Sequence, residues 1–179
     1  MFHYDNECRT TGTNTMPSRR SRAREVALQL LFQRDLNPKP VPRPDIERFA
    51  RDRLTDDAEA AAFCLALYDG VAARQAEIDP KLSATAENWR LNRMLPVDRN
   101  VLRLGAYELL FDPAGQPVAV VIDEAIELAR RFGSKESPGF VNGILDRIAR
   151  ARNAERGARS SEPEPAAPPG SEQPPPPGP

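Results

Sequence analysis

The segment from Pro117 to Gly133 limits most narrowly what this chain can fold into. Its apolar residues recur at the i, i+3, i+4, i+7 spacing of one helix face, while charged residues hold the opposite face. The β-branched run at its start could also suit a buried strand, but the helical period continues through Ala129. Strand-type alternation of Val, Ile and Thr is absent from the rest of the sequence. The sequence therefore predicts an all-α fold.

Prolines and capping residues divide the central part of the chain into about seven expected helices. The third is expected to stop at Asp79-Pro80, because proline lacks the N–H that would continue the helix and its ring clashes with the preceding turn. Short connections between successive helices predict antiparallel neighbours around one core. The expected helices cover residues 18–36, 44–53, 55–78, 86–92, 96–112, 117–133 and 137–152.

Both ends of the chain differ in composition from this central domain, which spans residues 18–153. Residues 1–17 are polar and without periodicity, and Met16 is an alternative start of translation. Residues 154–179 are rich in proline and have no aliphatic side chain larger than alanine. Such segments bury too little apolar surface to offset the entropy of ordering them. We expect both tails to be disordered.

Composition argues against catalysis and against a membrane location. The sole histidine, His3, lies in the N-terminal extension, and Cys8 and Cys64 are too far apart for a paired zinc or redox site. No glycine-rich phosphate loop, nucleophile motif, signal peptide or apolar run of membrane-spanning length occurs. The net charge of −1 indicates no global affinity for nucleic acid. We expect a cytoplasmic binding protein without catalytic residues, metal or cofactor.

Four arginines, which we call the arginine arm, open the first expected helix: Arg19, Arg20, Arg22 and Arg24. Like charges at this spacing repel one another unless a partner with regularly spaced negative charge compensates them. Phosphate fits, because the planar guanidinium binds it through two parallel hydrogen bonds. We therefore hypothesise that the arm binds nucleic-acid phosphates. The alternative is an ordinary solvated helix start.

Five segments in order resemble the NusB transcription antitermination family across about residues 18–153: Arg19–Glu25, Asn88–Leu91, Val97–Leu110, Asp123–Ala129 and Phe140–Asp146. The resemblance implies an all-α bundle of two three-helix lobes with an additional helix, and no catalysed reaction. It implies binding of single-stranded boxA RNA from ribosomal RNA operons together with the small-subunit ribosomal protein NusE. The pair would act in an RNA polymerase antitermination complex. Whether the free protein forms a homodimer stays open.

Carried over by position, the resemblance places Arg20, Arg22 and Arg24 on the RNA surface. Ser21 replaces one basic position, and Arg19 is expected to compensate. Tyr107 and Phe140 could stack on unpaired bases or pack in the core, and Arg103 could instead pair with Asp98 or Glu108 on its own helix. The remaining positions of the implied RNA surface are Arg103, Tyr107, Glu136 and Phe140.

The implied protein interface consists of Phe32 and Asp98. The first expected helix has an apolar face too wide for one packing seam, which favours a second burial surface at Phe32. Asp98 is also explained without a partner, because acidic residues stabilise helix N-termini.

Two other functions remain open from the sequence. One is a protein-only helical adaptor, in which the arginines merely keep the protein soluble. The other is a stand-alone RNA-binding module related to the N-terminal domain of ribosomal RNA cytosine methyltransferases, although the chain has no room for their catalytic part. Salt-dependent RNA binding would separate the adaptor from both RNA-binding alternatives.

Overall fold

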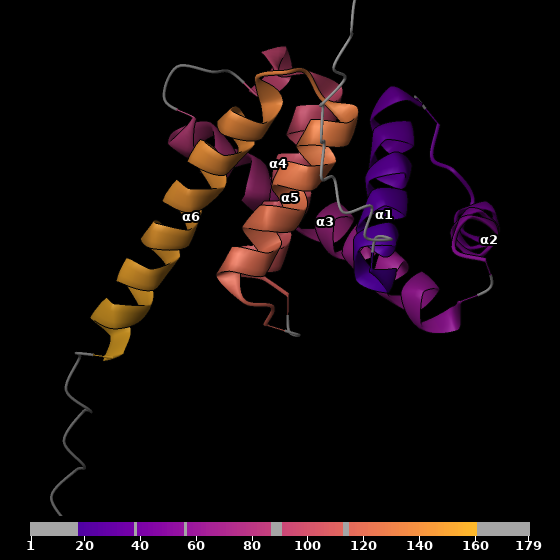
Figure 1. Ribbon diagram of the computed structural model, residues 1–179, viewed down its shortest axis with the longest axis horizontal. Helices are drawn as coiled ribbons and strands as arrows, with labels where there is room; N and C mark the ends of the chain where they lie inside the picture. The colour runs from indigo at the N-terminus through magenta and orange to yellow at the C-terminus, as the bar shows by residue number, and fades with distance from the viewer. Residues whose placement is uncertain (1–17, 38, 56, 87–90, 113–114, 161–179) are drawn as a thin grey trace, which may run out of the picture.

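The computed structural model describes residues 18–37, 39–55, 57–86, 91–112 and 115–160, and of residues 156–160 the helical backbone only. Within these ranges every regular element is a helix, which confirms the predicted all-α fold (Figure 1). The elements are α1 (Arg19–Leu36), α2 (Arg43–Arg53), α3 (Ala58–Thr85), the 3₁₀ turn η1 (Leu91–Arg93), α4 (Pro96–Leu110), α5 (Val118–Phe132) and α6 (Ser137–Ser160).

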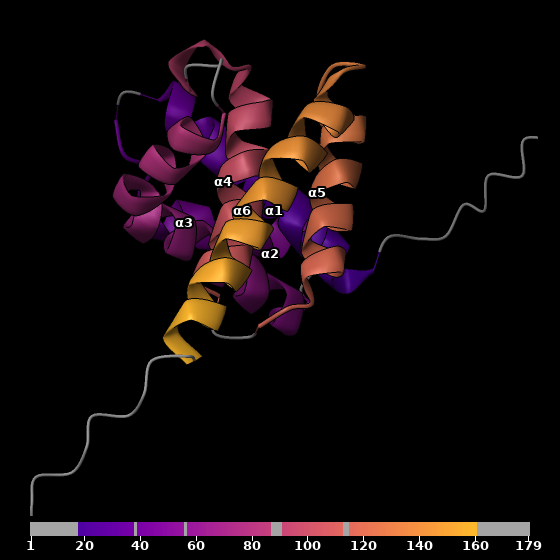
Figure 2. The same ribbon diagram turned by 90° about the vertical axis from the view of Figure 1, so that its left-hand side faces the viewer.

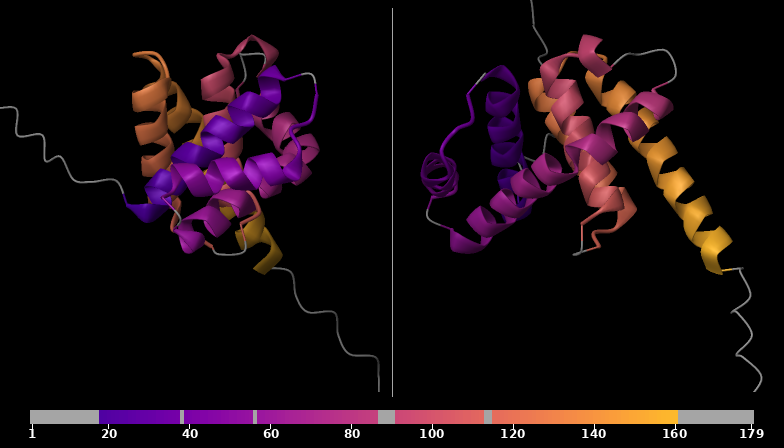
Figure 3. Two further views of the ribbon diagram at one scale, coloured as in Figure 1. Left: turned by 90° about the vertical axis from the view of Figure 1, so that its right-hand side faces the viewer. Right: turned by 180° about the vertical axis from the view of Figure 1, so that it is seen from behind.

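The helices form two lobes that share one hydrophobic core. Helices α1, α2 and α3 pack together in the first lobe, and α4, α5 and α6 in the second. Helix α4 contacts both α1 and α3, so it joins the lobes (Figures 2 and 3). Val71 of α3 and Leu102 of α4 are both fully buried at 0% exposure. No helix in the described ranges is long and apolar enough to cross a membrane.

The expected helix over 86–92 is not a full helix in the part of the chain that the structure describes. Residues 87–90 lie outside the described ranges, and Leu91–Arg93 form a single 3₁₀ turn. The described chain therefore has six α-helices instead of the seven expected.

Helix α3 continues through Pro80, so the predicted stop at Asp79-Pro80 is wrong. Pro80 itself is exposed to solvent. Ile78 and Leu82, four residues apart on one face, are both 0% exposed, and burial of this face stabilises the turn that proline weakens. Tertiary packing thus overrides the local signal.

Helix α6 extends through Ser160, beyond the expected end at Arg152, so residues 154–160 are helical. Ala149 is the last buried residue of α6 up to residue 155, and the following turns of the helix project past the rest of the bundle (Figures 1 and 3). The remainder of the proline-rich segment lies outside the described residues, as do residues 1–17.

Candidate functional site

Three residues of the arginine arm lie on the surface at the start of α1. The helix begins after Ser18, whose hydroxyl accepts a hydrogen bond from the amide of Ser21. The side chain of Arg19 is 76% exposed and lies 3.3 Å from the carboxylate of Asp57. Arg22 is 44% exposed and pairs with Glu25 at 3.1 Å. Ion pairs at such exposure contribute little to stability, so these guanidinium groups can exchange partners.

Arg20 is also exposed, and its guanidinium lies over the ring of Phe63 at 5.2 Å from the centroid. This contact leaves the hydrogen-bonding edge of the guanidinium unused by any ion pair of the described residues. Arg19, Arg20 and Arg22 therefore make up an accessible basic surface.

Arg24 differs from the other arginines of the arm, because its side chain is only 2% exposed. Its guanidinium donates hydrogen bonds to both carboxylate oxygens of Glu108, at 2.7 to 3.1 Å, and lies 3.8 Å from Glu124. Burial by itself would lower the pKa of Arg24, but the hydrogen bonds and the charge of Glu108 outweigh it and raise the pKa. The expectation that Arg24 contacts RNA is corrected, since its donors already bind acidic side chains inside the bundle.

Ser21, which stands where the resemblance expects a basic residue, contacts α5. Its hydroxyl donates a 2.6 Å hydrogen bond to Glu124. Together with the Arg24 contact, this bond fixes the start of α1 against α5. The exposed arginines therefore project from an anchored helix rather than from a frayed end.

Arg103 is likewise a structural residue in this fold, with 6% exposure. It donates two 2.8 Å hydrogen bonds to Asp79 and lies 3.0 Å from Asp35. The guanidinium of Arg103 therefore links α4 to α1 and α3. The expectation of an RNA contact at Arg103 is corrected, and so is the alternative pairing within its own helix.

Tyr107 is half-buried between α3 and α4. Its ring lies so close to Gly70 that a Cβ atom there would overlap it. It also stacks on Phe111, with ring centroids 6.4 Å apart and planes at 24°. The hydroxyl end of the ring thus lies against α3 at Gly70, which favours the packing alternative over base stacking.

Asp98, Glu136 and Phe140 line one hollow where α4 and α6 begin, although the resemblance divides them between two partners. The hollow has a volume of about 460 Å³. Asp98 is 7% exposed, and its Oδ1 atom is buried without a hydrogen bond from any described residue. Glu136 is exposed and accepts a 3.1 Å hydrogen bond from Ser134. The other lining residues are Arg93, Met94, Leu95, Ser134 and Ser137.

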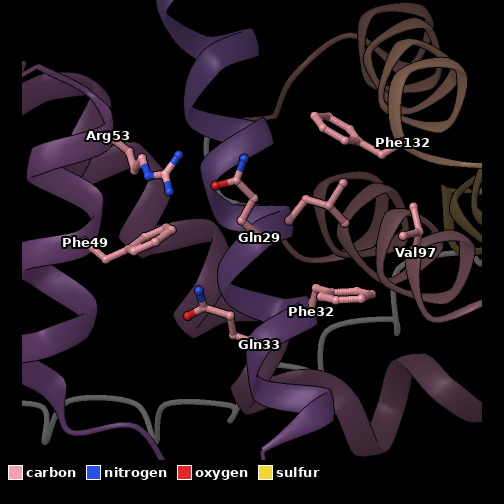
Figure 4. Close-up of a pocket in the computed structure, with 8 residues that line it drawn as sticks. Gln29, Phe32, Gln33, Phe49, Arg53, Val97 and Phe132 are labelled. Carbon is pink, nitrogen blue, oxygen red and sulfur yellow. The ribbon is translucent and has the colours of Figure 1, made fainter.

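Phe32 lines a second hollow, which we call the phenylalanine groove (Figure 4). This groove has a volume of about 430 Å³ and lies between α1, α2 and the ends of α4 and α5. Phe132 is 38% exposed at its rim, and Arg53 lies over the ring of Phe49 at 5.1 Å. The full lining is Leu28, Gln29, Phe32, Gln33, Phe49, Arg53, Val97 and Phe132.

Consecutive residues at the start of α4 line the two hollows, Val97 the phenylalanine groove and Asp98 the other. Phe32 and Asp98 therefore line different hollows that both reach the start of α4. Phe49 and Arg53 were not predicted from the sequence as residues of the groove, because α2 reaches the groove only through the chain reversal after α1.

Metal and thiol chemistry find no support in the described residues. No group of three His, Cys, Asp or Glu residues is placed to hold a metal ion there. Cys64 is buried, and burial, with a further effect of the charge of Asp69, raises the pKa of its thiol to about 12. The site is built from arginines, aromatic rings and carboxylates.

These features define a helical binding protein, with a basic surface at the start of α1 and two hollows at the start of α4. The model of the NusB family matches residues 21–150. A transcription antitermination protein NusB of Elusimicrobium minutum is 48% identical over 132 residues, covering 73% of this chain and 92% of the relative. A second transcription antitermination protein NusB, of Anaeromyxobacter dehalogenans, is 44% identical over 145 residues. The match covers 79% of this chain and all of the relative.

Solved structures agree with these relatives. T. maritima NusB is 42% identical, with a TM-score of 0.63, covering 75% of this chain and 93% of its own. A structure of the antitermination factors NusB and NusE in complex with double-stranded RNA contains a chain that is 25% identical, with a TM-score of 0.65. The match covers 74% of this chain and 97% of that chain. The chain belongs to the NusB family, whose members are transcription antitermination proteins and not enzymes.

Proposed function

We propose that this protein acts in transcription antitermination by binding RNA at the start of α1 and a protein partner at the phenylalanine groove. The observation that carries the proposal is the exposure of Arg19, Arg20 and Arg22 on a helix start held by the buried Arg24. Contacts to phosphates need guanidinium groups that are accessible to solvent. The guanidinium groups also keep a regular spacing only if the helix that carries them is held against the rest of the bundle. The solved structure that contains NusB, NusE and RNA supports both partners.

The RNA is proposed to be the single-stranded boxA element of ribosomal RNA operons. Phe140 is half-buried and lines the hollow beside Glu136, where its ring would stack on an unpaired base. Glu136 is exposed in the same place, and its charge would weaken rather than strengthen contact with phosphates. Arg24, Arg103 and Tyr107 are left out of this RNA surface.

The protein partner is proposed to be the small-subunit ribosomal protein NusE, bound through Phe32 and Asp98. The groove around Phe32 offers aromatic surface that the described chain does not cover, as expected of the centre of a protein interface. The unpaired Oδ1 of Asp98 would accept a hydrogen bond from a basic side chain of the partner. This protein and NusE would then act together on RNA polymerase in the cytoplasm. A homodimer of the free protein would form through the same phenylalanine groove.

Replacing Phe32 by Asp tests this assignment directly. The variant should lose binding to purified NusE while keeping its thermal midpoint nearly unchanged, because Phe32 is only partly buried. RNA binding without NusE should also persist, since the arm is untouched. Leu67→Asp, at a position 1% exposed, is the contrasting core variant and should unfold. A Phe32→Asp variant that unfolds likewise, or that still binds NusE, would rule out the groove as the partner site.

A further inference from the structure

We infer that the phenylalanine groove recognises a segment of NusE that carries an acidic side chain next to an apolar one, and that Arg53 binds the acidic side chain. This inference rests on the proposed function, because it names the chemistry that the groove selects in the partner. The proposed function itself depends on the aromatic surface around Phe32 and not on Arg53.

Arg53 is the one charged side chain among the described residues that line the groove. The rest of the lining consists of aliphatic and aromatic side chains and of the amides of Gln29 and Gln33. An apolar groove with a single cation is complementary to an apolar surface with a single anion. The hollow at Asp98 differs, because its lining contains acidic side chains as well as an arginine.

An aromatic ring holds the guanidinium of Arg53 at the groove. Arg53 is exposed, and its guanidinium lies over the ring of Phe49 at 5.1 Å from the centroid. Phe49 precedes Arg53 by four positions on α2, so both side chains leave the same face of the helix. Figure 4 shows both of them directed from α2 toward Gln29 of α1. A guanidinium that stacks through its face keeps the N–H groups at its edge free to donate to a carboxylate.

Two other arginines of α2 are paired with carboxylates of the chain, whereas Arg53 is not. Arg43 lies 2.8 Å from Glu47, and Arg48 lies 2.6 Å from Asp45. Arg53 makes no ion pair with any residue that the structure describes. Its charge is therefore available to a partner.

The neighbours of Arg53 explain why it has no such partner. The positions three and four before it on α2 are Ala50 and Phe49, which carry no charge. Asp52 is adjacent in sequence, and adjacent residues of a helix do not face each other. Asp57 is the first described acidic residue beyond α2, and its carboxylate caps the start of α3 and pairs with the arginine arm. Charge complementarity at the groove thus points to an acidic side chain of the partner.

The test compares Arg53→Gln with Arg51→Gln in binding of the full chain to purified NusE. Both arginines are exposed in the last turn of α2, so both variants lose one charge and its interaction with the helix dipole, but only Arg53 lines the groove. Arg53→Gln should weaken NusE binding about tenfold, as expected for the loss of a hydrogen bond between charged groups. Arg51→Gln should bind NusE like the unaltered chain. Unchanged binding by Arg53→Gln, or equal losses in both variants, would overturn the inference.

A second measurement identifies the acidic side chain and separates its loss from an effect on folding. Each exposed Asp and Glu of NusE is replaced in turn by Asn or Gln, and each NusE variant is titrated against the unaltered chain and against Arg53→Gln. One NusE variant should bind the unaltered chain about tenfold more weakly and should bind Arg53→Gln with no further loss. A folding defect in Arg53→Gln would instead weaken all NusE variants by the same factor. Additive losses for every NusE variant would therefore contradict the inference.

The Phe32→Asp variant distinguishes failure of this inference from failure of the proposed function. If Phe32→Asp loses NusE binding while Arg53→Gln keeps it, the groove remains the partner site and only the recognition of an acidic side chain is overturned. If Phe32→Asp keeps NusE binding, the groove is not the partner site, and both the assignment of the groove and the inference are overturned.

Discussion

The guanidinium of Arg24 and the carboxylate of Glu108 form a buried, two-pronged ion pair that joins α1 to α4. Both side chains are 2% exposed, and the shortest contact is 2.7 Å. Removing one partner of such a pair leaves the other as an uncompensated buried charge. We expect Arg24→Ala to lower the free energy of unfolding by about 3–5 kcal/mol, measured by chemical denaturation. Arg22→Ala, two residues away and 44% exposed, is the control and should cost less than about 1 kcal/mol. Similar losses in both variants would contradict this division of the arm.

Gly70 is required by the close approach of Tyr107. Because a Cβ atom at residue 70 would overlap the ring, Gly70→Ala should destabilise the protein by about 1–3 kcal/mol in spite of the better helix propensity of alanine. Gly143→Ala in α6 is the control, since nothing lies within 4 Å of the added atom, and it should be neutral or stabilising. The midpoint of thermal unfolding should therefore fall for Gly70→Ala and should stay unchanged or rise for Gly143→Ala. A Gly70→Ala protein as stable as the original would show that the ring is free to move aside.

Asp35 makes the stability of the fold depend on pH. Burial acts to raise the pKa of Asp35, but hydrogen bonds from Arg99 and Asn100 and the charge of Arg103 outweigh it, so its pKa lies below the ordinary value. The stabilisation is complete above the unfolded-state pKa of about 3.9 and is lost as the pH falls through the lower folded-state value. Unfolding free energies measured from pH 6 downward should decline in this acid range. Asp35→Asn should decline less steeply, and an identical pH profile would exclude Asp35 as the cause.

Phe140 distinguishes single-stranded from duplex RNA if it stacks on a base. Phe140→Ala should weaken binding to single-stranded boxA-type RNA by about 1–3 kcal/mol, because stacking needs an exposed base face. Binding to duplex of the same sequence should change little, since duplex offers mainly phosphates to the arm. Titrations of both RNAs check this, and equal losses on the two forms would make Phe140 a packing residue.

The sequence predicted the helices well but could not separate binding arginines from structural ones. All four arginines of the arm look alike in composition, and the acidic partners that hold Arg24 in the bundle, Glu108 and Glu124, lie far along the chain. One local signal was available, because Arg24 precedes Leu28 and Leu31 by four and seven positions and so shares their buried face.

Long-range packing also explains the remaining differences. Pro80 was read as a helix end, yet the burial of Ile78 and Leu82 keeps α3 intact around it. Arg103 was assigned to RNA, but it binds Asp35 and Asp79 from two other helices. Neither outcome follows from spacing within one helix.

The salt dependence of RNA binding by an arm variant tests the central claim most directly. The full chain with Arg19→Gln, Arg20→Gln and Arg22→Gln is compared with the unaltered chain, using single-stranded boxA-type RNA. A control variant loses the same charge through Arg43→Gln, Arg48→Gln and Arg51→Gln, at exposed positions of α2 outside both hollows. The proposed function predicts weaker binding and a salt slope reduced by about 0.7 for each lost phosphate contact, with an unchanged melting temperature and an unchanged slope for the control. An arm variant that binds this RNA with the affinity and salt slope of the unaltered chain would contradict it.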